Sequence, residues 1–315
     1  MKKRILFYPV CIIALLFFCQ IGYSQQKPLI LTSTSDVASI TKSIAGTTAE
    51  VLSAMQGGEN PDYLVPTRRV ELKSKDAKMF LKIGVGLESK WETALLNKSA
   101  NPNISEGASG NIVVTDGIKV LPSTSADGKT DPWIHKQGNP YVWLNPVNGK
   151  IIAENIYKTL LFYFPQEKEY MLKNKKRFQT RLDKKIKQCK ERMKPYNGLK
   201  VVAYNHNFDY FAKAFGIIIA DYLEPAPGVP PKKEWVKHII EQIKNQNIPL
   251  LIIADYNNQR IPRQIIKQTG ADLVILPTSV GSEWVNEYTQ IFDYITNKIH
   301  LAMKKRQAAL KTSEQ

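Results

Sequence analysis

The sequence predicts an α/β protein of two lobes, each with a central, mostly parallel sheet, joined by one long rigid helix. Three observations predict this class. Short apolar segments alternate with helical segments on both sides of a long amphipathic stretch at residues 166–194, as in β-α-β units. The 315 residues are enough for about two domains. The composition, 43% hydrophobic and 23% charged, is globular and excludes a disordered or collagen-like chain.

The first predicted lobe covers residues 25–165 and contains four strands. In order, they are Pro28–Ser33, Glu50–Met55, Lys78–Val85 and Gly117–Pro122. Helices are predicted at Asp36–Ile44, which Ser35 is placed to cap, at the segment holding Trp91, Leu95 and Leu96, and at Asn148–Phe164. Pro165 interrupts the last of these helices.

The connecting helix is predicted at Gln166–Lys194, within a connector assigned to residues 166–195. Its apolar residues recur at helical spacing and form one stripe: Met171, Phe178, Leu182, Ile186, Cys189 and Met193. A helix of this length is about 43 Å long, which is enough to run along both lobes.

The second predicted lobe covers residues 196–315. Its strands are Leu199–Tyr204, Ile217–Leu223, Pro249–Ala254 and Leu273–Leu276. Its helices are Phe208–Phe215, Trp235–Lys244, Arg263–Gln268 and Glu287–Met303. In parallel α/β sheets, ligands bind outside the carboxyl ends of the strands, so the functional residues are sought there.

The N-terminal segment has the pattern of an export signal. Positive charges at residues 2–4 precede the apolar run Ile5–Phe18, and Gly22 and Ser24 supply the small residues of a cleavage site. The run is about 14 residues long, which is too short to span a bilayer. We therefore expect cleavage near Ser24 and a periplasmic location. Lipidation of Cys19 is an alternative, although bulky residues precede it.

The chain is strongly basic. Lysine and arginine number 44 against 28 acidic residues, which gives a formal net charge of +16. Residues 166–194 alone hold twelve cations and four acids. We interpret this excess as a solvated helix face; an anion-binding face for nucleic acid or anionic lipid is the alternative. Aromatic residues are not interleaved with the cations as in single-strand binders, so no nucleic-acid partner is expected.

Common catalytic motifs are absent from the sequence. There is no G-x-S-x-G elbow, Walker loop, G-x-G-x-x-G after a strand, H-E-x-x-H or C-x-x-C. Four stretches at predicted strand ends instead join a Pro or Gly turn to polar or aromatic side chains. They are Asn60–Tyr63, Gly138–Pro146, Tyr204–Phe208 and Leu223–Gly228. In an α/β fold this rim is where ligands bind.

With these stretches, the sequence resembles the zinc/manganese-type periplasmic solute-binding proteins of ABC importers. The resemblance rests on Gly138–Pro146, Phe208–Gly216 and Glu224–Pro231, with further segments matching in order and spacing. It covers nearly the whole mature chain. It implies two α/β lobes on a rigid helix, a metal ion held between them, and delivery of that ion to a membrane permease.

The metal site implied by the resemblance is altered in this chain. The family pattern has histidines where Asp62 and Tyr141 stand, and a third where this sequence has Asn205, with His206 one place later. Carboxylates complete the family's site from the second lobe, where Glu224 and Asp255 are the candidates.

The expected metal ligands are therefore Asp62, Tyr141, Asn205, His206, Glu224 and Asp255. These residues are far apart in the sequence, and we expect them to face one crevice between the lobes. We expect His135, His238 and His300 to be surface or interface residues.

The cargo implied is a divalent cation of the Mn²⁺ or Zn²⁺ class. Oxygen ligands suit harder ions such as Mn²⁺, whereas a site with few imidazoles binds Zn²⁺ weakly. Two alternatives stay open. The fold has lost its metal and binds a small polar solute or acts as an accessory protein, or the chain is an exported enzyme that uses Asp62, His206 and Glu224 for acid–base chemistry.

The expected partner is the membrane permease of an ABC importer, and the chain is expected to be a monomer without enzymatic activity. No disulfide is expected, because Cys189 is the only cysteine after the targeting segment.

Overall fold

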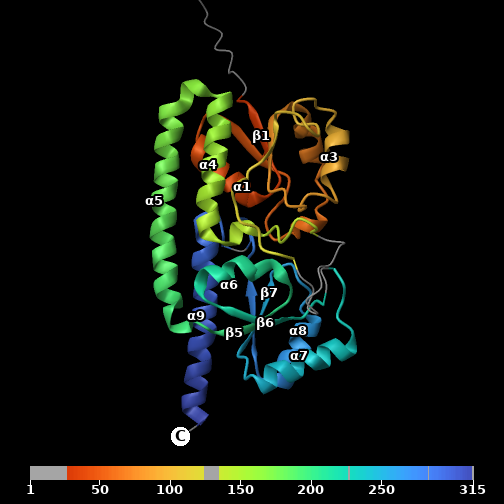
Figure 1. The fold of residues 1–315 in the computed structure, drawn as a ribbon, viewed down its shortest axis with the longest axis vertical. Coiled ribbons are helices and arrows are strands. Elements are labelled where there is room, and N and C mark those ends of the chain that lie inside the picture. Colours follow the sequence, from red (N-terminus) through yellow and green to blue (C-terminus); the bar gives the residue numbers. More distant parts are fainter. Residues whose placement is uncertain (1–26, 124–134, 226–227, 283, 314–315) are drawn as a thin grey trace, which may run out of the picture.

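The computed structural model describes residues 27–123, 135–225, 228–282 and 284–313. The predicted cleavage site and Cys19 lie outside these residues. The described chain forms two lobes stacked along the long axis of the molecule, with one long helix beside both (Figure 1). Within the described ranges, no helix is both long and apolar enough to cross a bilayer.

The N-terminal lobe is built on a four-stranded parallel sheet. Its strands are β1 (Leu29–Thr32), β2 (Glu50–Ser53), β3 (Ala77–Lys82) and β4 (Asn111–Val113), in the order β2-β1-β3-β4. The helices of this part are α1 (Ser35–Ala45), α2 (Arg68–Lys73), α3 (Glu92–Ser99) and α4 (Pro146–Tyr163). Both faces of the sheet are covered, which explains why the central strands contain the apolar runs at residues 29–31 and 79–81.

The C-terminal sheet repeats this arrangement. Its strands are β5 (Lys200–Ala203), β6 (Ile218–Tyr222), β7 (Leu250–Ala254) and β8 (Asp272–Leu276), all parallel and ordered β6-β5-β7-β8. Its helices are α6 (Asp209–Phe215), α7 (Lys233–Asn245) and α8 (Arg260–Thr269). The predicted α/β class with two parallel sheets is thus confirmed, while the exact lobe boundaries at residues 165 and 195 stay predictions.

Two long helices flank the sheets: α5 (Lys168–Met193) runs beside both, and α9 (Tyr288–Ser313) runs along the C-terminal sheet (Figure 1). The first has 26 residues, is about 39 Å long, and packs against α1, α4 and α9. The apolar stripe predicted on it is its buried side, with Ile186 partly buried. The second continues ten residues beyond the predicted end at Met303. Short 3-10 turns precede several helices; the two that matter for function are Pro61–Tyr63 and His206–Phe208.

Three local predictions were wrong. The fourth strand is Asn111–Val113 rather than Gly117–Pro122, because the backbone of Leu121 bonds to the Tyr210 hydroxyl and to Asn139 instead of to a strand. Thr34, not Ser35, caps α1, since its Oγ1 accepts the Val37 N–H at 3.2 Å. Helix α2 was not predicted at all.

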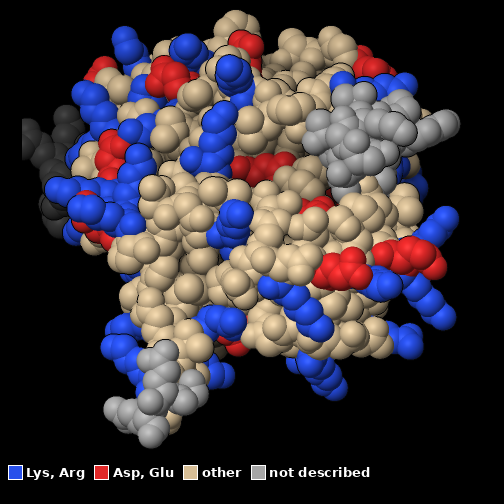
Figure 2. Space-filling model, turned by 60° about the horizontal axis from the view of Figure 1, so that its bottom comes forward, with Lys and Arg blue, Asp and Glu red and all other residues tan. Residues whose placement is uncertain are grey.

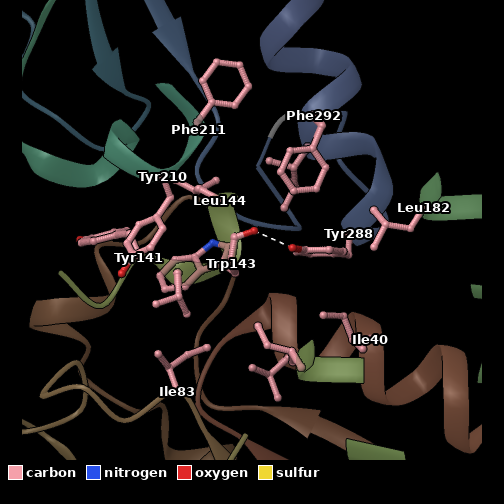
Figure 3. Close-up of a cluster of buried hydrophobic side chains, with 14 of the residues drawn as sticks. Ile40, Ile83, Tyr141, Trp143, Leu144, Leu182, Tyr210, Phe211, Tyr288 and Phe292 are labelled. Atoms are coloured by element: carbon pink, nitrogen blue, oxygen red, sulfur yellow. Dashed lines mark hydrogen bonds between the residues drawn. The ribbon is translucent and has the colours of Figure 1, made fainter. Parts of the chain in front are cut away.

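The hydrophobic core is continuous between the lobes. Trp143 is fully buried at the centre, with Phe211 and Phe292 on one side of it and Ile40 and Ile83 on the other (Figure 3). The lobes therefore share one interior in addition to the helices that run along them.

The segment that leads from β8 into α9 (residues 277–282 and 284–287), here called the strap, fastens the second lobe to the first together with Tyr288 at the start of α9. Trp143 Nε1 donates to Thr278 O at 2.8 Å, and Tyr288 Oη donates to Trp143 O at 2.5 Å. Val280 N donates to Asp36 Oδ1 at 3.0 Å. A Cβ at Gly57 would overlap the backbone of Gly281, so glycine is required at this contact.

The carboxyl of Asp36 makes the strap sensitive to pH. Burial raises the pKa of Asp36 to about 7, although the hydrogen bond from Val280 acts in the opposite direction. Burial likewise raises the pKa of Glu88, in the β3–α3 loop, to about 7; its carboxylate accepts the Ile83 N–H of the same loop. The folded-state pKa values of these two carboxyls lie above the unfolded ones. The stability that the two protonated carboxyls contribute is therefore complete below about pH 4 and is lost as the pH rises through 7.

An Asp36→Asn variant is therefore expected to show a weaker pH dependence of stability. Between pH 5.5 and 8 the native chain should lose about 2 kcal/mol for each of the two carboxyls, and the variant should lose about half of the total. Asparagine keeps the acceptor for Val280 but carries no charge. Urea unfolding at the two pH values measures the difference, and identical pH profiles for both chains would contradict the assignment.

Candidate functional site

A small cavity of about 20 Å³ lies between the two lobes. This is enough room for one water-sized guest such as a single ion. It is lined by Asp62, Ser123, His135, Asn139, Pro140, Tyr141, Asn205, His206 and Asn207. The carboxylate and one imidazole come from the first lobe, and the second imidazole from the second lobe. Three of the four strand-end stretches singled out in the sequence thus meet at one place, and the described residues of Leu223–Gly228 do not line the cavity.

Asp62 is held in position by its own short turn. The Asn60 side chain accepts the Asp62 N–H at 3.0 Å, and Trp91 Nε1 donates to Pro61 O at 3.0 Å. The side chain is buried, with only 8% of the residue exposed. A carboxylate buried to this degree needs partners, and those partners define the site.

The closest cationic or metal-binding partner of Asp62 is His135. Its Nε2 lies 3.0 Å from Asp62 Oδ1. Within the described residues, however, neither of these two atoms makes an aligned hydrogen bond, and neither does His135 Nδ1. Buried polar atoms without partners are costly, so a carboxylate oxygen and an imidazole nitrogen that converge in this way are typical of a site that takes an ion.

Tyr141 forms a hydrogen bond with the other carboxylate oxygen of Asp62. Its hydroxyl donates to Asp62 Oδ2 at 2.8 Å and lies 3.2 Å from Tyr256 Oη, to which Asn207 Nδ2 donates at 2.6 Å. Burial, the charge of Asp62 and the neighbouring Tyr256 hold the pKa of Tyr141 well above its ordinary value. Tyr141 therefore remains a neutral phenol that positions the carboxylate.

His206 enters the cavity from the second lobe with its orientation fixed. Its Nδ1 lies 2.8 Å from Asp209 Oδ2, and its ring packs on Tyr222 with 3.8 Å between centroids. When Nδ1 donates to a carboxylate in this way, the lone pair of a neutral imidazole is on Nε2, as in metal-binding histidines. Asn139 Nδ2 donates to His206 O at 2.7 Å and so connects the two lobes here.

Asn205 and His206 both line the cavity, although they are adjacent in the sequence. On a strand they would point to opposite faces. The chain instead turns at this point into the 3-10 turn His206–Phe208, which Asn205 caps through the Asn207 N–H. The turn therefore keeps both side chains at the site.

Glu224 and Asp255, the remaining predicted ligands, do not line the cavity. Glu224 Oε1 accepts the Gly228 N–H at 2.9 Å. Burial raises the pKa of Glu224, the Gly228 and Asn205 hydrogen bonds lower it, and the charges of Asp62 and His206 act on it more weakly. Glu224 thus lies just outside the site. Asp255 follows β7 and lies across from Gly58 of the first lobe.

The expectation that three histidines are surface or interface residues fails for His135, which is 8% exposed. His238 pairs with Asp221 at 3.0 Å and His300 with Tyr196 at 2.9 Å, both away from the cavity. The only signal for His135 in the sequence is its place three residues before the Gly138–Pro146 stretch.

The donor set is sparse for a transition metal. In the part of the chain that the structure describes, no group of three or more His, Cys, Asp or Glu side chains is close enough to hold a metal ion. The cavity instead offers one carboxylate–imidazole pair, a second imidazole and amide oxygens.

Comparison with known proteins identifies the family of this chain. The sequence profile of the family described as zinc-uptake complex component A, periplasmic (ZnuA), matches residues 30–302. The chain belongs to the ZnuA family. The family resemblance expected from the strand-end stretches is thereby confirmed.

Relatives of this ZnuA-family chain match it over nearly its full length. The manganese ABC transporter substrate-binding lipoprotein PsaA of Streptococcus anginosus is 27% identical over 293 residues, covering 90% of this chain and 91% of the relative. The metal ABC transporter substrate-binding lipoprotein FimA of Streptococcus parasanguinis is 28% identical over 296 residues, covering 89% and 92%.

Solved structures of the same kind share the fold. A crystal structure of ZnuA superimposes with a TM-score of 0.74 at 18% identity, covering 88% of this chain and 99% of that one. The Mn-bound periplasmic metal binding protein of Candidatus Liberibacter asiaticus gives 0.71 at 23% identity, covering 87% and 98%. At these identities the likeness establishes two lobes on a long helix.

Proposed function

We propose that this chain is the exported substrate-binding component of a metal ABC importer, that its cargo is a divalent cation, and that it delivers the cation to a membrane permease without catalysing a reaction. The family membership supports the class, and so does the likeness to PsaA and FimA, which are substrate-binding lipoproteins of manganese and metal ABC transporters. The observation that carries the proposal is the cavity between the lobes, with Asp62 Oδ1 and His135 Nε2 converging in it.

The ligand set we propose differs in part from the one predicted from the sequence. Asp62 Oδ1 and His135 Nε2 bind the ion first. His206 Nε2 and the Asn205 amide oxygen complete the coordination from the second lobe by moving towards the ion, since no three His, Cys, Asp or Glu side chains of the described chain lie close enough to hold it as they stand. Tyr141 positions Asp62. Glu224 and Asp255 supply negative charge nearby without direct bonds.

This donor set favours Mn²⁺ over Zn²⁺. Carboxylate and amide oxygens suit hard cations, whereas Zn²⁺ is bound most tightly by several imidazoles or thiolates. The cavity volume also favours an ion over an organic solute, because about 20 Å³ holds only a water-sized guest. A lost metal site with a polar solute in its place is therefore the weaker candidate.

Metal titration of the mature chain tests the proposal. After removal of metal with a chelator, calorimetry is expected to show near-stoichiometric Mn²⁺ binding that weakens at least about tenfold in Asp62→Asn and in His135→Gln. His238→Gln is the matched control, because His238 also lies 3.0 Å from an aspartate but outside the cavity. It should bind like the native chain.

Two results would overturn the proposal. One is a native chain that binds neither Mn²⁺ nor Zn²⁺. The other is a loss of affinity in His238→Gln as large as in the two cavity variants. Thermal unfolding of each variant establishes that the chain is folded before its affinity is compared.

A further inference from the structure

Nine of the eleven cations of α5 fall into two groups with different surroundings, and Lys168 and Lys190 belong to neither. Those on the flanks of the buried stripe form ion pairs with neighbouring helices: Lys175 with Glu154, Arg181 with Glu287, and Lys185 and Arg192 with Asp293. These residues fasten α5 to α4, α9 and the strap. Their charges are neutralised within the molecule.

The second group, here called the basic face, comprises Lys173, Lys176, Arg177, Lys184 and Lys187. All five are exposed, and none forms an ion pair with any residue of the described ranges. At 100° per residue they fall within an arc of about 100°, opposite the buried stripe. The row from Lys173 to Lys187 is about 21 Å long.

Nearby acids offset this charge only in part. Of the acids on α5, Asp183 is paired with Lys150, while Glu169 and Glu191 lie one turn beyond Lys173 and Lys187, at the two ends of the row. In Figure 2, Lys and Arg side chains, with some Asp and Glu among them, gather at the left edge of the molecule, where α5 lies in Figure 1. Because like charges on one helix repel, this face costs stability unless an anion covers it.

We propose that the basic face docks the protein on an anionic phospholipid bilayer. Each Lys or Arg near such a surface is attracted to it, and a straight row of five cations on one side of a rigid helix fits a flat, negatively charged surface. A component that delivers cargo to a membrane permease works next to the bilayer, which is the one point at which this inference draws on the proposed function.

Single-stranded nucleic acid fits the same face poorly. Binding of that kind needs exposed aromatic rings on which the bases stack. Of the two aromatic residues of α5, Phe178 is buried, and Tyr170, although 39% exposed, is a single ring near one end of the helix, so the basic face offers no series of rings for stacking.

Co-sedimentation with lipid vesicles tests the docking surface. The mature chain is expected to bind vesicles of phosphatidylcholine with about 30 mol % phosphatidylglycerol at about 50 mM salt, but not pure phosphatidylcholine vesicles, and to be released at about 500 mM salt. A variant with Lys176, Arg177, Lys184 and Lys187 replaced by Glu should lose at least about tenfold in partitioning.

The matched control replaces Lys75, Lys119, Lys233 and Lys244 by Glu. These lysines are also exposed and outside ion pairs among the described residues, and their replacement changes the net charge equally. The control should retain most of its binding. Both variants should melt and bind Mn²⁺ like the native chain, so failure of the metal proposal and failure of this one are separate results.

Three outcomes would overturn the docking surface. The first is the absence of binding to the anionic vesicles, and the second is an equal loss in the basic-face and control variants. The third is tighter binding of the native chain to single-stranded nucleic acid than to the vesicles at the same salt, with the basic-face variant losing both.

Discussion

A Tyr141→His variant is expected to bind Zn²⁺ at least about tenfold more tightly than the native chain. The native phenol keeps its proton, because burial and the charge of Asp62 raise the pKa of Tyr141. The phenol hydroxyl donates its hydrogen bond to Asp62 Oδ2 and does not act as a metal ligand. Imidazole is shorter than phenol, so its Nε2 would stop short of Asp62 and leave room for an ion bonded at about 2.1 Å.

Tyr141→Phe is the control for this change. It also frees Asp62 Oδ2 from the phenol, but it adds no nitrogen. Competition titration with a fluorescent zinc chelator measures both variants, and Mn²⁺ titration shows whether the preference has moved from the harder to the softer ion. Equal Zn²⁺ affinities in the two variants would show that position 141 does not face the bound ion.

Trp143→Ala is expected to lower the free energy of unfolding by about 4 kcal/mol. Trp143 is fully buried where the two lobes share their core. Its removal leaves a cavity and also deprives Thr278 O of the 2.8 Å hydrogen bond from Nε1. Urea denaturation followed by circular dichroism measures the loss.

Trp284→Ala is the matched control, because Trp284 is 78% exposed. Its replacement should change the free energy of unfolding by no more than about 0.5 kcal/mol. If Trp143→Ala proves as stable as Trp284→Ala, the core around Trp143 does not hold the lobes together.

The elements that could be predicted are those in which local pattern and tertiary packing agree. Strand β7 is buried along its whole length, so its sequence is an unbroken apolar run that is recognisable without the structure. The stripe of α5 was predictable for the same reason, since helical spacing alone selects Met171, Phe178 and Leu182 as buried residues.

The elements that were missed depend on contacts with distant parts of the chain. The fourth strand is decided by pairing with Phe80–Lys82, which favours Asn111–Val113 over the equally apolar segment that follows. The last ten residues of α9 carry no apolar period strong enough to predict them. Their helix follows from good helix formers such as Ala308, Ala309 and Leu310.

The candidate site was predictable only in its outline. Asp62, Asn205 and His206 follow the strands predicted at residues 50–55 and 199–204, and parallel strands bring such ends together. Tyr141 was predicted from the Gly138–Pro146 stretch, since the strand predicted before it was wrong. His135 follows no strand and has no motif, and it meets Asp62 only through the fold. A carboxylate–imidazole contact between residues so far apart in sequence leaves no local pattern to recognise.

The strap also bears on how fast cargo is exchanged. Its hydrogen bonds from Trp143, Val280 and Tyr288 would all have to break before the lobes could swing widely apart. Breaking them together costs several times the thermal energy, so a jaw-like rotation is rare. On the proposed function, the ion is expected to leave through a local rearrangement of the side chains that line the cavity. Its residence time would then be governed by these side-chain contacts and not by the travel of a whole lobe.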